Sequence, residues 1–471
     1  MSTSLKYVSH DPYDRRKFIA LSVLLFLVIV RIGFYLPVLV RPDLSIFPDS
    51  GDYQRISDRL LSQTAYAWKT DNPEELWRTV GYPLFLAAIS FFWGDETFKV
   101  AVVQLVISGL LVLFVFTYLY RSLEYFHAFL AALLMVVDPL SILLSLMILS
   151  ETLFTFILFI AFVFIAHWAA TQQRSYLMVA GVFLGAACLV RPIGQLMVVI
   201  WLGMILLYPD RTHPFWRKKY ISSKLINALV FMFPIALLLA PWVVRNSTLW
   251  DCPTISSISR INNRDYIAAK VISESDKIPL SEAIAQLNET DAGPCPQKNI
   301  KYYKIILGHP VVYIKLFLGG TLAVVAGNKV DLWLQTLGVN YHQPDLWLPF
   351  LDGGLKQVFS LLRDEFLKFP ALLWGFGALA AFQFFIYGLA LIGANSIRWV
   401  VSGSKKWEMS LVIVTLITLI LAPGMIGDER FRVPAQPFLI CLAGYGLSLK
   451  FLPFLRHRYF GTQEAMPSMK D

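Results

Sequence analysis

The stretch FIALSVLLFLVIVRIGFYLPVLV (residues 18–40), followed shortly by FPDSGDY (residues 47–53), decides the fold of this chain. The first run is long enough to cross a bilayer, which takes about 20 apolar residues. Three basic residues at positions 15–17 precede it, and basic residues beside a first span hold that end in the cytoplasm. Asp49 and Asp52 are therefore expected on the outer side of a membrane.

The composition of the chain is typical of a polytopic membrane protein. Of its 471 residues, 56% are hydrophobic and 15% are charged, which is more apolar surface than a soluble domain of this size buries. The net charge of +9 resides largely in short loops, where Lys and Arg record topology and contact anionic lipid headgroups. We therefore expect membrane lipids as partners and no binding of nucleic acid.

About ten apolar runs are predicted to cross the membrane. They are Phe18–Val40, Phe98–Tyr120, Ala128–Ser145, Thr152–Ala170, Tyr176–Val190, Ile193–Tyr208, Leu225–Val244, Ala371–Asn395, Met409–Met425 and Pro434–Phe451. The first run is too long for a typical signal-peptide core and lacks a small-residue cleavage site, so it should remain as a span. Basic loops and a basic tail place both termini in the cytoplasm.

Shorter helices complete a predicted all-α fold. Between Asp49 and Ser62, apolar residues recur at helical spacing among polar ones, which predicts an amphipathic helix on the membrane surface. Gly81–Trp93 is too short for an ordinary span and is expected to be a juxtamembrane, interfacial or half-inserted helix. Val311–Ala326 contains a Gly-Gly pair and a lysine, which favours a re-entrant or surface helix, with an additional span as the alternative.

Charge and hydropathy divide the chain into three regions. Residues 1–245 form a transmembrane core that includes the first exterior loop. Residues 246–370 form an exterior loop region with a re-entrant or additional membrane helix, and residues 371–471 form the C-terminal membrane helices.

The four cysteines fall into two pairs. Cys188 and Cys441 lie inside apolar runs and are expected to be small core residues. Cys252 and Cys295 flank a polar exterior region and show no metal-ligand spacing. We predict that they form a disulfide on an oxidising outer face, with two free thiols as the alternative.

This topology brings polar residues at the outer helix ends to one face of the membrane. They are Asp49, Asp52, Arg78, Tyr82, Asp138, Glu151, Arg191 and the cluster Asp428–Arg432. Ionisable groups at the apolar layer are costly, which favours a function. Structural explanations also exist: Asp49 suits a helix cap, and Glu151 opens a span where the helix dipole favours a carboxylate. Arg31 lies inside the first span and is expected to snorkel outward or to pair with an acid or a lipid phosphate.

These groups suit the transfer of a sugar from a lipid phosphate. The phosphate leaves without a strong general acid, so one carboxylate that takes the acceptor's proton suffices, and arginines stabilise the charge that develops. The seven histidines are scattered, without His-x-x-x-His or Glu-x-x-His on an outer face. No metal ligand or cofactor is therefore assigned, although a divalent metal is left open. No glycine-rich nucleotide loop follows a strand, which argues against a soluble sugar nucleotide as donor.

Five short motifs resemble, in family order, landmarks of the GT-C membrane glycosyltransferases, in particular the branch with protein O-mannosyltransferases and the aminoarabinose transferase of lipid A. They are DSGDY (Asp49–Tyr53), RTVGYPLF (Arg78–Phe85), SETL (Ser150–Leu153), VRP (Val190–Pro192) and ERFRVP (Glu429–Pro434). The resemblance covers most of the chain up to Arg245 and about the last hundred residues. The exterior region between them matches nothing in the family.

The resemblance implies an inverting transferase that uses a polyprenyl or dolichyl phosphate sugar. It makes Asp49 the catalytic base. Asp52 departs from the usual single acid, so either carboxylate could be the base and the other a positioning group. The donor phosphate is assigned to Arg78, Tyr82, Arg191, Arg430 and Arg432, with Glu151 and Glu429 as further candidates.

The predicted function is therefore transfer of a sugar from a lipid-phosphate carrier to a hydroxyl group of a glycan, lipid or protein on the outer or luminal side. The expected location is a bacterial inner membrane, with a role in cell-envelope glycosylation. A lipid-linked sugar flippase or transporter would instead place polar residues near the midplane of the spans. A glycan polymerase or ligase of another fold would also use exterior arginines, but it does not predict the acidic motif of the first loop.

Overall fold

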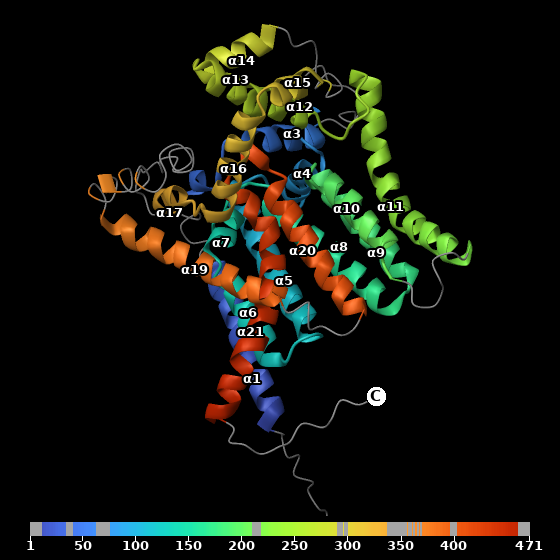
Figure 1. Ribbon diagram of the computed structural model, residues 1–471, viewed down its shortest axis with the longest axis vertical. Helices are drawn as coiled ribbons and strands as arrows, with labels where there is room; N and C mark the ends of the chain where they lie inside the picture. The colour runs from blue at the N-terminus through green and yellow to red at the C-terminus, as the bar shows by residue number, and fades with distance from the viewer. Residues whose placement is uncertain are drawn as a thin grey trace, which may run out of the picture.

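The computed structural model describes residues 12–33, 41–62, 76–209, 218–289, 295, 300–336, 356, 360, 363–364, 367, 370–395 and 403–459. These residues form helices joined by turns, and they contain no β-strand. Figure 1 shows a bundle of long helices with shorter helices gathered toward one end. The predicted all-α fold is confirmed.

The bundle helices follow the predicted spans in order. They are α1 (Pro12–Gly33), α5 (Thr97–Tyr120), α6 (Tyr125–Val136), α7 (Pro139–Leu146), α8 (Glu151–Thr171), α9 (Arg174–Val190), α10 (Gly194–Leu206), α11 (Lys218–Trp250), α19 (Pro370–Asn395), α20 (Gly403–Leu421) and α21 (Gln436–Tyr459). By length and composition, four of the described helices qualify as membrane spans, or up to six if each of two bent pairs counts as one. The chain is thus a polytopic membrane protein, and the total of about ten spans stays a prediction.

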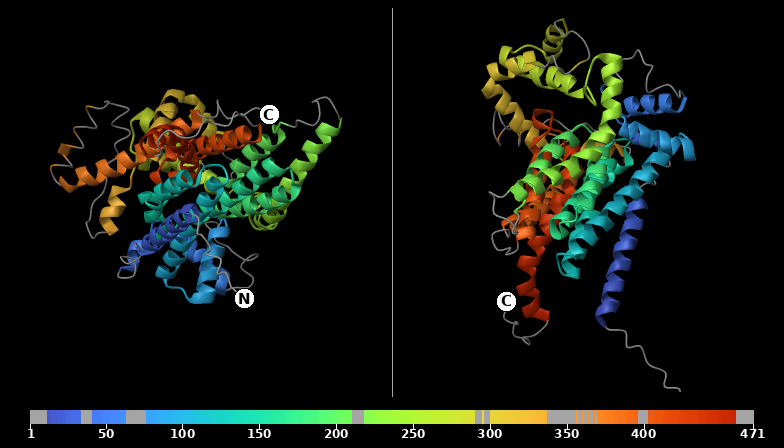
Figure 2. Two further views of the ribbon diagram at one scale, coloured as in Figure 1. Left: turned by 90° about the horizontal axis from the view of Figure 1, so that it is seen from below. Right: turned by 90° about the vertical axis from the view of Figure 1, so that its right-hand side faces the viewer.

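The shorter elements lie toward one end of the bundle. They are η1 (Pro42–Ser45), α3 (Ser50–Ser62), α4 (Gly81–Trp93), α12 (Ile258–Ile261), the π-helix η4 (Asn262–Ala268), α13 (Ala269–Asp276), α14 (Leu280–Glu289), α15 (Ile300–Gly308), α16 (Pro310–Ala326), α17 (Val330–Thr336), η7 (Gly424–Ile426) and η8 (Glu429–Ala435). Helix α1 begins and α21 ends at the opposite end (Figures 1 and 2). Which side of the membrane each end faces stays a prediction.

The predicted span Ala128–Ser145 is not one continuous helix. The structure divides it into α6 and α7, which meet at 49°. Asp138 caps α7 by accepting a hydrogen bond from the backbone N–H of Ser141 (2.9 Å), and Pro139 occupies the first turn. Because proline has no N–H and aspartate is a favoured N-cap, this dipeptide ends one helix and starts the next.

Arg31 of α1 binds to this break. Its guanidinium donates to the carbonyl groups of Met135 and Val136 (both 2.8 Å) and to the hydroxyl groups of Ser108 and Ser141. The side chain is 1% exposed, so the expectation that it snorkels outward is wrong. The end of α6 leaves carbonyl groups without helical partners, and one guanidinium can donate to several of them.

Glycines allow α16 to pack closely against the segment around η7. A Cβ on Gly320 would lie 2.2 Å from the carbonyl oxygen of Gly424, and one on Gly427 would lie 1.8 Å from that of Gly320. Glycine alone permits such an approach. Helices α15 and α16 meet at 99°, which leaves both predicted alternatives for Val311–Ala326 open, a re-entrant helix and a span.

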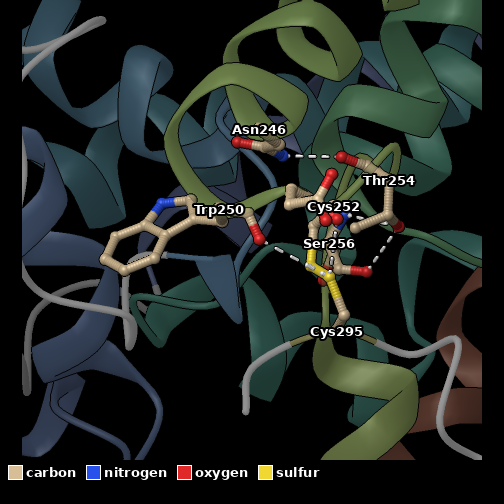
Figure 3. Close-up of a disulfide and its surroundings, with 7 residues drawn as sticks. Asn246, Trp250, Cys252, Thr254, Ser256 and Cys295 are labelled. Carbon is tan, nitrogen blue, oxygen red and sulfur yellow. Dashed lines mark hydrogen bonds between the residues drawn. A yellow bond between two sulfur atoms is a disulfide. The ribbon is translucent and has the colours of Figure 1, made fainter.

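The disulfide between Cys252 and Cys295 is present, with Cα atoms 5.5 Å apart, so this prediction is confirmed (Figure 3). Cys188 and Cys441 are free and buried, as expected. The disulfide joins the segment that follows α11 to a position 43 residues further along the chain.

Loss of this disulfide should destabilise the protein. In the chain-entropy model, closing a loop of this length stabilises the folded state by about 4 kcal/mol. Cys252→Ser, Cys295→Ser and the double variant should lower the midpoint of thermal unfolding in detergent by similar amounts, because each removes the same bond. A double variant that unfolds at the temperature of the unchanged protein would contradict this expectation.

Candidate active site

The first part of the site is the loop that leads into α3. Ser50 is fully buried at the start of this helix. Its hydroxyl accepts a hydrogen bond from the N–H of Phe47 and donates one to the carbonyl group of Ile148, both at 2.9 Å. These bonds tie the loop to the turn before α8. They hold Asp49, the residue before Ser50, near the N-terminal end of α8, where Glu151 lies.

The turn before α4 presents Arg78. Thr79 donates a hydrogen bond to the carbonyl group of Val190 (2.9 Å) at the end of α9. Gly81 packs on the same end of α9, where a Cβ would lie 2.6 Å from backbone atoms. Arg191 comes directly after Val190 in the sequence. The contact with Val190 therefore holds the turn that bears Arg78 close to the backbone of Arg191.

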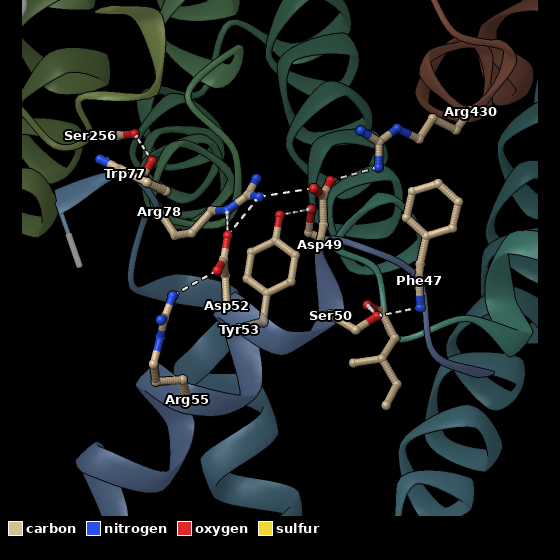
Figure 4. Close-up of polar contacts among 12 residues, drawn as sticks. Phe47, Asp49, Ser50, Asp52, Tyr53, Arg55, Trp77, Arg78, Ser256 and Arg430 are labelled. Atoms are coloured by element: carbon tan, nitrogen blue, oxygen red, sulfur yellow. Dashed lines mark hydrogen bonds and ion pairs between the residues drawn. The ribbon is translucent and has the colours of Figure 1, made fainter. Parts of the chain in front are cut away.

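Arg78 joins the two carboxylates of the first loop (Figure 4). Its Nη2 lies 2.9 Å from Oδ1 of Asp49 and 3.0 Å from Oδ2 of Asp52, and its Nε lies 3.2 Å from the latter atom. The other oxygen of Asp52 accepts from Nη2 of Arg55 at 2.7 Å. The predicted pair of acids is thus brought together, with a shared arginine between them.

A second arginine reaches Asp49 from the far end of the sequence. Nη1 of Arg430 lies 2.7 Å from Oδ2 of Asp49, and its Nε lies 3.8 Å from Oε1 of Glu151. Arg191 pairs with the same oxygen of Glu151 at 2.6 Å and donates to the hydroxyl of Ser150 at 3.2 Å. Glu151 is 1% exposed, and the two arginines are the cations that lie beside this buried carboxyl group.

The charges of the cluster hold Asp49 ionised. Burial is the largest single effect on this carboxyl and would raise its pKa. The guanidinium groups of Arg430 and Arg78 together outweigh burial, so the pKa of Asp49 is lowered from its ordinary value of 3.8. Burial in turn works against the charge of Arg430, but Glu151, Asp49 and Asp428 outweigh it and raise the pKa of Arg430.

The arginines are packed on aromatic rings and remain partly open to solvent. The guanidinium of Arg430 lies 5.0 Å from the ring centre of Phe47 and 5.1 Å from that of Phe431. Arg78 lies in the same way over Tyr53, at 5.1 Å. About one sixth of the Arg430 side chain is exposed. A ligand can therefore reach guanidinium groups that the protein already holds in place.

Four arginines face three carboxylates in this cluster. The arginines are Arg55, Arg78, Arg191 and Arg430, and the acids are Asp49, Asp52 and Glu151. The planar guanidinium group matches a phosphate with two parallel hydrogen bonds, so these arginines suit an anionic ligand of that kind.

Three predicted site residues have other surroundings. Tyr82 is fully buried and donates to Oε1 of Gln104 at 2.8 Å, with its ring edge-on to a tyrosine of α3. Arg432 is 2% exposed and donates to three carbonyl groups at the C-terminal end of α16, at 2.9 to 3.1 Å. Glu429 pairs with Lys329 at 3.1 Å. Tyr82, Arg432 and Glu429 thus contact groups outside the cluster of Asp49, Asp52 and Glu151. Of the ERFRVP motif, Arg430 is the residue that contacts this cluster.

The structure adds residues that the sequence reasoning missed. Arg55 lies three residues after Asp52 on α3, a spacing that places two side chains on one helix face and could have indicated the pair. Ser150, which begins the SETL motif beside the candidate Glu151, accepts a hydrogen bond from Arg191. Lys329 lies in the region that resembled no family, so no motif pointed to it.

No group of three or more His, Cys, Asp or Glu side chains within the described residues is arranged to hold a metal ion. The carboxylates of the cluster contact arginines instead.

Comparisons with known proteins concern the family and the fold of the chain. A family model described as dolichyl-phosphate-mannose-protein mannosyltransferase matches residues 78–238. The apo form of the oligosaccharyltransferase from Archaeoglobus fulgidus is similar in structure, with a TM-score of 0.51 and 14% identity over 94% of this chain and 51% of that chain. The same protein in complex with Zn and sulfate gives a TM-score of 0.50 and 13% identity, over 92% and 50%.

A third structure, the archaeal oligosaccharyltransferase AglB from Archaeoglobus fulgidus with an inhibitory peptide and a dolichol-phosphate, gives a TM-score of 0.49 and 13% identity, over 96% of this chain and 53% of that one. The chain therefore spans about half the length of the solved structures that it matches. At 13–14% identity, the likeness to the apo form and to the complex with Zn and sulfate shows the fold alone. A search among curated proteins found no match.

Substitution of two glycines tests whether the protein needs the close contact between α4 and α9. Gly81→Ala places a methyl group against the backbone of α9, so it should destabilise the protein by about 1 to 3 kcal/mol, as overpacking does. Gly51→Ala in α3 is the control, since a Cβ there meets nothing within 4 Å. Thermal unfolding should separate the two variants. Equal midpoints would show that α4 does not need this close approach.

Proposed function

We propose that this chain is a membrane glycosyltransferase of the GT-C type and that it transfers a sugar from a polyprenyl or dolichyl phosphate to a hydroxyl group. The observation that carries the proposal is Asp49, a carboxylate held between Arg78 and Arg430. One group takes a proton and the other two bind a phosphate, which are the roles that this reaction requires.

In the proposed reaction, the acceptor oxygen attacks the anomeric carbon of the donor sugar. The bond between that carbon and the phosphate oxygen breaks, and its electron pair leaves with the phosphate. Asp49 takes the proton of the acceptor hydroxyl. A single displacement of this kind inverts the anomeric centre. Arg430 and Arg78 stabilise the added charge on the leaving phosphate.

Donor binding also makes Asp49 a better base. In the free protein, both of its oxygens contact guanidinium groups, which lower its pKa and thus its basicity. A donor phosphate competes for the same N–H groups. As the guanidinium groups turn to the phosphate, their hold on Asp49 weakens and its pKa rises toward a value that suits proton transfer.

Asp52 and Glu151 position the arginines around Asp49. Asp52 accepts from Arg55 and Arg78 and so orients Arg78 toward Asp49. Glu151 draws Arg191 to the other side of the cluster, where Arg191 supplies a further cation for the phosphate. We therefore assign Asp52 and Glu151 to positioning.

We also propose on which side of the membrane the cluster lies and which region binds the acceptor. We place the end of the bundle that bears the cluster on the outer side of a bacterial inner membrane, with both termini in the cytoplasm. We assign the donor site to the regions 1–245 and 371–471, and the acceptor site to the described helices between residues 258 and 336. Glycan, lipid and protein acceptors all offer the hydroxyl group that the reaction requires.

Substitution of each acid tests the assignment of the base. Asp49→Asn keeps the shape of the side chain and removes its basicity, so release of dolichyl phosphate from dolichyl-phosphate mannose should fall about 100-fold or more. Asp52→Asn should retain more activity than Asp49→Asn, because it only loosens Arg78. Folding is checked by gel filtration and thermal unfolding in detergent.

The reverse order of activities would transfer the role of base to Asp52. Full activity of both variants would remove both acids from the reaction. A protein that moves the lipid-linked sugar across vesicles without cleaving its phosphate bond would instead be a flippase.

The pH dependence of kcat/KM, which reports the pKa values of the free protein, tests the arginine clamp. Only ionised Asp49 can take a proton, so activity falls as the pH drops through its pKa. Arg430 lowers that pKa, so Arg430→Gln raises it and the acid limb of the activity profile should move to higher pH. Arg363→Gln is the control, because Arg363 is exposed and pairs with Asp364. Coinciding acid limbs for Arg430→Gln and the unchanged protein would contradict the clamp.

A further inference from the structure

The turn that bears Arg78 is held by a segment far away in the sequence. The carbonyl group of Leu76 accepts a hydrogen bond from the N–H of Ser257 at 2.7 Å. The carbonyl group of Trp77 accepts one from the hydroxyl of Ser256 (Figure 4). Both contacts are made to the two residues directly before Arg78. The position of this arginine therefore depends on residues 256–257.

The hydroxyl of Ser256 is placed to serve this turn. Besides donating to Trp77, it accepts a hydrogen bond from the N–H of Ile258 at 3.2 Å. Ser256 is 5% exposed and Ser257 is fully buried, so water does not replace these bonds easily. On the other side of the turn, Thr79 is bonded to α9. Arg78 is thus fixed between two supports.

Residues 252–257 form no helix or strand, so their shape depends on other bonds. The carbonyl group of Thr254 accepts from the side-chain amide of Asn246 at 2.6 Å, and its hydroxyl donates to the carbonyl group of Ser256 at 2.8 Å. Cys252 is fully buried at the start of the segment and is bonded to Cys295 (Figure 3). The disulfide therefore anchors the segment that supports Arg78.

We propose that Ser256 is a positioning residue for Arg78 and that the Cys252–Cys295 disulfide holds Ser256 in place. The proposal rests on the proposed function, since it concerns an arginine assigned there to the donor phosphate. Nη2 of Arg78 contacts Asp49 and Asp52 at once, at 2.9 and 3.0 Å. A small shift of the turn lengthens both contacts, and hydrogen bonds weaken steeply with poor geometry.

Two readouts on the full-length protein in detergent test this proposal. Ser256→Ala should lower the release of dolichyl phosphate from dolichyl-phosphate mannose about fivefold, the value of one hydrogen bond. It should also move the acid limb of the pH profile to higher pH, because Arg78 no longer lowers the pKa of Asp49 fully. Cys295→Ser should do the same. Ser259→Ala, at an exposed serine of α12, should do neither.

The second readout does not depend on activity. Hydrogen exchange followed by mass spectrometry reports the amide of Ser257, which donates to Leu76. Its exchange should become faster in Ser256→Ala and in Cys295→Ser and stay unchanged in Ser259→Ala. Unchanged protection in Cys295→Ser would overturn the role of the disulfide.

Arg78→Gln separates this inference from the proposed function. If Arg78→Gln loses turnover while Ser256→Ala keeps the turnover and pH profile of the unchanged protein, the positioning role is overturned and the proposed function stands. If Arg78→Gln itself keeps full turnover, both are overturned. A merely structural role of Ser256 would reduce the amount of folded protein and leave the pH profile in place, which also overturns the proposal.

Discussion

The ion pair between Asp49 and Arg430 is the interaction on which the site depends. It joins residues 381 positions apart and so closes the first loop onto the segment before the last helix. Charges at this depth are stable only when they are paired, because burial without a partner costs several kcal/mol. The loop into α3, the turn before α4 and η8 must therefore meet at one point. Arg78 contacts the other oxygen of the Asp49 carboxylate.

Two further arginines donate hydrogen bonds to backbone carbonyl groups where a helix ends. Arg31 donates to carbonyl groups at the end of α6, and Arg432 does the same at the end of α16. In each case a cation lies at the negative end of a helix, where the helix dipole favours it. Both guanidinium groups thus bind backbone carbonyl groups in this structure.

Much of the fold could be predicted from the sequence. The helix at Asp49–Ser62 follows from its apolar spacing and the one at Gly81–Trp93 from the length of its apolar run, and the structure places them at 50–62 and 81–93. The break at Pro139 was missed because the apolar run continues through it. Hydropathy records burial in lipid, whereas the break is decided by one missing N–H and one capping carboxylate.

The site was predicted less completely than the fold. Asp49, Arg78, Glu151, Arg191 and Arg430 were named from motifs and do meet. The sequence could not separate Arg430 from Arg432, which lie two residues apart in one motif. Their roles differ because η8 turns one toward Asp49 and the other toward the carbonyl groups of α16. Such a distinction depends on tertiary packing, which short motifs do not record.

The central claim is that a lipid-linked phosphate binds to the arginines around Asp49. A cryo-electron microscopy structure of the full-length protein with dolichyl phosphate tests it most directly. The phosphate should lie within hydrogen-bond distance, about 3 Å, of the guanidinium groups of Arg430 and Arg78, with Asp49 beside it. A phosphate bound at the opposite end of the bundle, or away from all of these arginines, would contradict the claim.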